Sequence, residues 1–135
     1  AYDAAMVDVL HQAGAEWVAL AGYDRILSPG FVRAFAGRMV NMHPSLLPKF
    51  GGKGMVGLKV HATVLAAGET ESGCTVHGVT EGVDEGPLLG QARVPVLPGD
   101  TPETLAARVL EAEHALYPAV LQRVLSEYRA DSPFS

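Results

Sequence analysis

Asn41 and His43 stand two positions apart and are the side chains of this sequence best suited to act together in chemistry. In an extended strand, residues at this spacing project from the same face, so both can reach one atom. An amide beside an imidazole can stabilise a developing oxyanion, and the imidazole can also supply a proton. Pro44 then ends regular strand pairing and exposes the pair. Spacing alone leaves open a plainer interpretation, in which Asn41 completes a turn and His43 ends a strand.

A second candidate is the carboxylate of Asp84, which lies between Gly82 and Gly86. Glycines on both sides allow positive φ angles and a close approach of the backbone to a ligand. In that setting Asp84 can orient the imidazole of His43 and raise its pKa. The alternative is that Asp84 only forms an Asx-turn.

The composition is that of a folded domain. The chain has 135 residues, of which 48% are hydrophobic and 19% charged, and this length fits a single domain over 1–135. The formal net charge is -5 and the basic residues are scattered, so we expect no nucleic-acid partner. Cys74 is the single cysteine, which excludes an internal disulfide. We expect no zinc site, membrane span or targeting segment, and a cytoplasmic location.

Hydrophobic periodicity predicts an α/β domain that would position these residues. The expected elements are a helix over 2–10, a buried strand over 17–22, a helix over 29–37, a strand over 38–43, a helix over 57–68, strands over 74–80 and 88–96, and a helix over 102–129. The first strand–helix–strand unit favours parallel neighbours joined by a right-handed crossover, whereas the last two strands can pair antiparallel. The irregular segment 44–56 follows the carboxyl end of a strand, where open α/β sheets bind ligands.

Four segments taken together resemble the glycinamide ribonucleotide transformylase family of purine biosynthesis. They are AGYDRILSP, NMHPSLLPKF, SGCTVHGVTEGVDEGP and AEHALYP, and the resemblance runs from Ala1 to about Leu125. The NxHPSLLP motif is shared by the wider folate formyltransferases, and AEHxLYP favours this family among them. The resemblance implies a three-layer, mostly parallel, Rossmann-like formyltransferase fold. It also implies N-terminal incompleteness, because the family's first strand and its glycine-containing phosphate-binding loop have no counterpart here.

The resemblance assigns a catalytic trio of Asn41, His43 and Asp84. In the implied reaction, the amine of glycinamide ribonucleotide attacks the formyl carbon of 10-formyltetrahydrofolate without a covalent enzyme intermediate. Asn41 and protonated His43 hold the oxyanion, while Asp84 keeps His43 charged. No metal is required, the partners are small molecules, and we expect a monomer or homodimer.

The resemblance also implies binding residues. A pterin pocket is expected from Arg25, Ile26, Leu27, Met39, Val79, Glu81, Gly82 and Asp84. The acceptor is expected to contact Met42, Pro44 and Glu113, although Glu113 on its own reads as a solvated helix residue. Supporting roles beside the site fall to His77 and His61. Cys74, in a strand, is expected to be a small core residue and no nucleophile.

Three other functions use similar residues. Formyltetrahydrofolate hydrolase uses the same trio but delivers the formyl group to water, and would carry an N-terminal regulatory domain. Methionyl-tRNA formyltransferase would need a basic extension for tRNA. A catalytically incomplete folate-binding fragment would bind ligand without turnover. One departure from the family pattern is Asp24, where a bulky apolar residue is usual.

Overall fold

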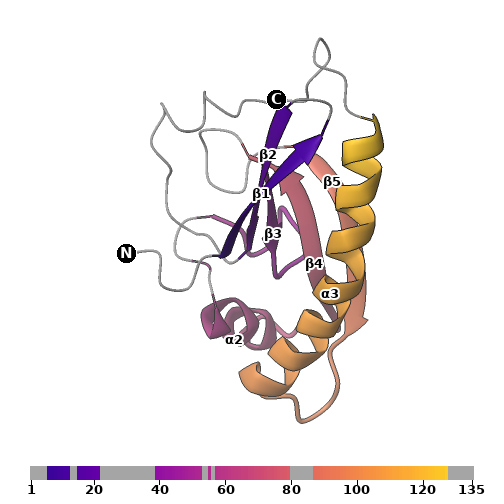
Figure 1. The fold of residues 1–135 in the computed structure, drawn as a ribbon. Coiled ribbons are helices and arrows are strands. Elements are labelled where there is room, and N and C mark those ends of the chain that lie inside the picture. The colour runs from indigo at the N-terminus through magenta and orange to yellow at the C-terminus, as the bar shows by residue number, and fades with distance from the viewer. Residues whose placement is uncertain are drawn as a thin grey trace.

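The computed structural model describes residues 6–12, 15–21, 39–52, 55, 57–79 and 87–127. Five strands form one sheet in the order β1-β2-β3-β4-β5. The strands are β1 (Met6–Gln12), β2 (Ala15–Ala21), β3 (Met39–His43), β4 (Glu71–Gly78) and β5 (Leu88–Pro95). The helices of the described residues are α2 (Leu58–Ala66) and the long α3 (Pro102–Glu127), which runs beside β4 and β5 (Figure 1).

Most of the predicted elements are confirmed. The expected strands 17–22 and 38–43 correspond to β2 and β3, which pair in parallel with Val18 opposite Met39. The helices over 57–68 and 102–129 are α2 and α3, and Pro118 lies inside α3. The last two strands do pair antiparallel, although β4 begins at Glu71. The predicted helix over 29–37 lies outside the described residues.

The helix predicted over 2–10 is wrong, because residues 6–12 form strand β1. This strand pairs antiparallel with β2, from Met6 opposite Ala21 to Gln12 opposite Ala15. Helical spacing over nine residues is weak support for a helix, and β-branched Val7 and Val9 favour an extended chain. Because only two residues link this segment to β2, it lies beside β2, and pairing with β2 satisfies the backbone hydrogen-bonding groups of β1.

The prediction of a mostly parallel sheet is also wrong for the described strands. Only β2 and β3 are parallel, whereas the three other neighbouring pairs are antiparallel. For β1 and β2 the reason is the link of only two residues, since a parallel pair needs a crossover segment. The α/β class is confirmed. A third layer, which would need helices on the second face of the sheet, is not described by these residues.

The hydrophobic core lies between the sheet and α3, and α2 closes one end of it (Figure 1). Alternate residues of the central strands enter this core, namely Val40 and Met42 of β3 and Cys74 and Val76 of β4. Because side chains alternate along a strand, the opposite face receives Asn41, His43, Thr75 and His77. These four polar side chains are buried as well, at no more than 4% exposure. The sheet therefore separates an apolar face from a buried polar face.

Helix α3 begins at a network of hydrogen bonds around Asp100. The Asp100 carboxylate accepts hydrogen bonds from Arg108 at 2.8 and 3.0 Å and from the Leu97 backbone N–H at 2.8 Å. The Arg108 bonds, and then the Leu97 N–H, hold the pKa of Asp100 well below its usual range. Thr101 caps the helix by accepting the Thr104 N–H at 3.2 Å. This end of α3 is thereby fixed against the loop that follows β5.

Core packing by α3 makes a testable prediction at Leu105, which is fully buried with 0% exposure. We expect Leu105→Ala to lower the free energy of unfolding by about 2–5 kcal/mol, because truncation leaves a cavity. Leu110 lies on the same helix but is 47% exposed, so Leu110→Ala is the matched control. Its expected cost is within about 0.5 kcal/mol. Urea denaturation measures both variants, and equal losses would contradict the described orientation of α3.

Candidate active site

The structure brings Asn41 and His77 into contact across two neighbouring strands. Asn41 of β3 lies directly opposite His77 of β4, and the Asn41 Nδ2 atom is 3.4 Å from Nε2 of His77. The other ring nitrogen of His77, Nδ1, lies 2.9 Å from the Gly78 carbonyl oxygen. A carbonyl only accepts hydrogen bonds, so Nδ1 carries the proton and Nε2 of the neutral ring accepts from Asn41. The amide nitrogen of Asn41 is thus directed at His77.

His43 is placed on the same face at the end of β3. Its Nε2–H donates to the carbonyl oxygen of Phe50 at 2.9 Å, and the side chain is only 3% exposed. Phe50 has a φ of 56°, in the left-handed region that residues other than glycine rarely adopt. The segment after β3 is therefore turned back so that its backbone fixes the imidazole of His43.

A second histidine, His61, lies in the first turns of α2 and is 4% exposed. Its pKa is lowered from the ordinary value, first by burial and then by the charge of nearby His43. Within the part of the chain that the structure describes, Nδ1 of His61 has no hydrogen-bond partner. Burial and the charge of His43 each favour a neutral His61 when His43 carries a proton.

Two of the predicted apolar residues of the pterin pocket also lie beside this site. Met39 precedes Asn41 by two residues in β3 and is 1% exposed. The Val79 backbone N–H donates to the Met39 carbonyl oxygen at 2.8 Å, which places the two residues side by side. The other predicted pocket residues lie outside the described residues, namely Arg25, Ile26, Leu27, Glu81, Gly82 and Asp84. The third member of the expected trio is among them.

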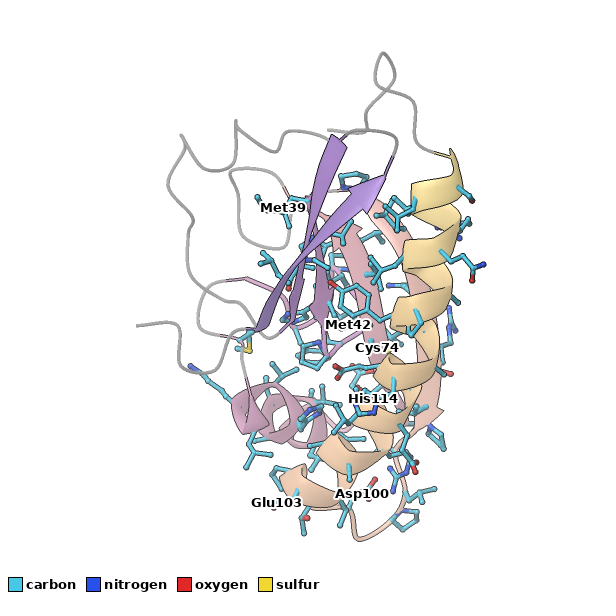
Figure 2. All side chains as sticks on the ribbon, viewed as in Figure 1. Met39, Met42, Cys74, Asp100, Glu103 and His114 are labelled. Atoms are coloured by element: carbon cyan, nitrogen blue, oxygen red, sulfur yellow. The ribbon has the colours of Figure 1, made fainter. Side chains whose placement is uncertain are left out.

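Of the three predicted acceptor-binding residues, Met42 and Glu113 lie on the opposite face of the sheet from Asn41 and His43, whereas Pro44 directly follows His43. Met42 is buried on the α3 side of the sheet, together with Cys74 (Figure 2). Glu113 lies on α3 and its charge acts on Cys74, so it belongs to that side too. Burial raises the pKa of Glu113 to about 7. Pro44, partly exposed, follows His43 at the end of β3.

Cys74 is confirmed as a core residue. Its side chain has 0% exposure, and Figure 2 places it between the strands and α3. Burial, and secondarily the charge of Glu113, raises the pKa of the thiol to about 11. A thiol that stays protonated at neutral pH is a poor nucleophile. His114 of α3 is exposed.

The comparison with known families decides how this arrangement is to be understood. Residues 1–121 match the family described as formyl transferase. The chain belongs to the formyl transferase family. No group of three or more histidine, cysteine, aspartate or glutamate side chains that could hold a metal occurs within the described ranges. None of the helices described here is long and apolar enough to cross a membrane.

Several known proteins resemble the chain in sequence and in fold. Phosphoribosylglycinamide formyltransferase of Escherichia coli is 46% identical over 121 residues, covering 90% of this chain and 55% of that protein. The crystal structure of phosphoribosylglycinamide formyltransferase from Brucella melitensis has a TM-score of 0.70 and 56% identity, covering 82% of this chain and 54% of the other. A formyltetrahydrofolate deformylase from Pseudomonas syringae has a TM-score of 0.68 at 29% identity, covering 84% and 38%. The chain thus spans about half the length of these three proteins, or less.

Sequence reasoning missed the residues that hold the HPSLLP segment of this chain in place. The Thr75 hydroxyl donates to the Ser45 carbonyl at 2.7 Å and accepts the Leu47 N–H at 3.1 Å. The Gln91 side-chain amide donates to Thr75 Oγ1 at 3.0 Å and to the Leu47 carbonyl at 2.9 Å. One signal was available in the sequence, because Thr75 precedes His77 by two residues and therefore shares its face. Gln91 gave no such signal.

Proposed function

We propose that this chain forms the formyl-transfer site of a phosphoribosylglycinamide formyltransferase. The enzyme would move a formyl group from 10-formyltetrahydrofolate to the amine of glycinamide ribonucleotide in purine biosynthesis. The observation that carries the proposal is the placement of Asn41 and His43 on one buried polar face, within a chain of the formyl transferase family. High identity to enzymes with this name supports the choice of acceptor.

The chemistry assigned to the two side chains is stabilisation of an oxyanion. The acceptor amine forms a bond to the formyl carbon, the formyl oxygen becomes negative, and the bond from that carbon to N10 of the folate then breaks. The Asn41 amide carries two N–H groups, one directed at His77 and one assigned to the formyl oxygen. A protonated His43 has two ring N–H groups, so it can donate to the same oxygen while keeping its bond to Phe50.

The proton lost by the attacking amine must finally reach N10 of the departing folate. Asp84 is proposed to assist this transfer through water and to keep His43 charged, as the family resemblance implies. The neutral state favoured for His61 is consistent with a single charged imidazole at the site. His43 would therefore be the ring that bears the proton.

The two substrates are proposed to meet at the carboxyl end of β3, where Pro44 follows His43. Met39 and Val79 offer apolar contact for the flat pterin ring beside Asn41. The remaining pocket is assigned to Arg25, Ile26, Leu27, Glu81, Gly82 and Asp84. Glu113, with Met42 and Pro44, is assigned to the acceptor. A carboxyl whose pKa is about 7 can accept hydrogen bonds from ribose hydroxyls as a carboxylate and also donate one when protonated.

The proposal is tested by following loss of the formyl group spectroscopically from 10-formyltetrahydrofolate, with and without glycinamide ribonucleotide. We expect turnover that depends on the acceptor. Turnover that proceeds equally without acceptor would instead identify a hydrolase acting on formyltetrahydrofolate. Folate binding without any turnover would show that this chain alone is a catalytically incomplete fragment.

A further inference from the structure

A row of three polar side chains crosses the sheet at the end of β3. Thr75 of β4 lies directly opposite His43 of β3, and Gln91 of β5 lies directly opposite Thr75. Residues opposite each other in a sheet project from the same face. The row therefore reaches from an edge strand of the described sheet to the imidazole assigned to formyl transfer.

Thr75 uses its complete hydrogen-bonding capacity on this row. A hydroxyl has one donor and two acceptor positions. The Thr75 hydroxyl donates to the Ser45 carbonyl and accepts from the Leu47 N–H and from the Gln91 amide. Thr75 and Ser45 have 0% exposure and Leu47 has 4%, so water does not compete for these bonds.

Gln91 completes the arrangement from the outer strand. Although the residue as a whole is exposed, its amide nitrogen donates to both Thr75 Oγ1 and the Leu47 carbonyl. The backbone of residues 45–47 is consequently held at three points, two carbonyls and one N–H. The same loop supplies the Phe50 carbonyl that fixes the ring of His43. It is held together internally by the Ser45 hydroxyl, which donates to the Lys49 carbonyl at 2.6 Å.

We propose that Thr75, assisted by Gln91, is a positioning residue that holds the HPSLLP loop and, through the Phe50 carbonyl, sets the orientation of His43. Thr75 itself touches no reacting atom. The kinetic part of this inference rests on the proposed formyl-transfer function, whereas the effect on the His43 ring does not. Removal of the hydroxyl frees the loop, so the Phe50 carbonyl no longer holds the His43 ring in a fixed orientation.

The test compares Thr75→Val, which keeps the shape but removes the hydroxyl, with Thr75→Ser, which keeps the hydroxyl. In acceptor-dependent formyl transfer, Thr75→Val is expected to lower kcat by about 10-fold to 100-fold, the scale of ångström-sized misplacement of a catalytic group. The KM for the folate should stay within about twofold, since such a loss belongs to the transition state. Thr75→Ser should restore most of kcat. Equal impairment by both variants would show that the methyl group matters through packing, and would overturn the proposal.

A second measurement reads the His43 ring directly, by nitrogen-15 NMR of the histidine side chains across a pH series. We expect shifted His43 signals in Thr75→Val and wild-type signals in Thr75→Ser. If Thr75→Val does not fold, the same NMR measurement on Gln91→Leu, a substitution on the edge strand, tests the proposal. Shifted His43 signals would support it, and unchanged signals would overturn it. Arg93→Leu is its control, because Arg93 lies two residues along β5 and bonds Glu71 at 3.2 Å, away from the loop.

The two readouts separate the two possible failures. Shifted His43 signals in a protein whose wild type shows no acceptor-dependent turnover would leave the positioning role standing and remove the proposed function. If the wild type is active but Thr75→Val and Gln91→Leu keep both kcat and the His43 signals, the proposed function would stand and the positioning role would be refuted.

Discussion

Replacement of His43 by alanine is expected to reduce acceptor-dependent kcat by about 10²–10⁴-fold, the range for loss of a positioned acid or base. The side chain is 3% exposed and fixed by the Phe50 carbonyl, so solvent cannot easily substitute for it. The loss combines a missing donor to the oxyanion with a missing positive charge in a buried setting. Steady-state formyl transfer at saturating folate measures the effect.

The matched control for this substitution is His114→Ala. His114 is a histidine on the exposed surface of α3, and its replacement should leave kcat within about twofold, as for other surface substitutions. Retention of more than a tenth of wild-type kcat by His43→Ala would contradict the assignment. The plainer interpretation, in which His43 only ends a strand, would then hold.

Substitution of Asn41 by alanine is expected to lower kcat by about 10²–10³-fold, as for loss of one oxyanion donor. The amide lies between His77 and the assigned position of the formyl oxygen, and Nε2 of neutral His77 accepts one of its N–H groups. The proposed catalytic contribution of Asn41 therefore depends on donated hydrogen bonds. Pre-steady-state transfer at saturating substrates isolates this step from product release.

Asn41→Asp tests whether donation is what matters, because aspartate keeps the shape but offers only acceptors when ionised. We expect it to be no more active than the alanine variant. If Asn41 merely completed a turn, aspartate would serve nearly as well, and near wild-type activity would refute the catalytic role. Thermal unfolding of both variants corrects the rates for any change in the folded fraction.

The central elements of the fold could be predicted because their signals are local. The continuous apolar run that became β2, and the Thr-Pro start of α3, each indicate their structure within a few residues. β1 could not be predicted, because a short run of mixed apolar residues takes the structure that its partner imposes. The prediction of strand direction failed for a related reason, because the direction depends on which strands become neighbours.

The candidate site also combines features that the sequence predicts with features that it does not. The shared face of Asn41 and His43 follows from strand alternation, and the structure confirms it. The contacts of His43 with Phe50, and of Leu47 with Thr75 and Gln91, join residues 7, 28 and 44 positions apart. No pattern in one sequence specifies such pairs without the strand registers. The role of Asp84 stays a prediction, since it lies outside the described residues.

The protected thiol of Cys74 gives this chain an internal probe of its own opening. It is the single cysteine of the sequence, fully buried, with its pKa raised to about 11. Alkylating reagents attack the thiolate, so the folded state is doubly shielded, by exclusion and by protonation. Labelling requires excursions that open the core between the sheet and α3, where Cys74 is packed. The rate of labelling therefore measures how often those excursions occur in the unmodified protein, without any added dye or engineered tag.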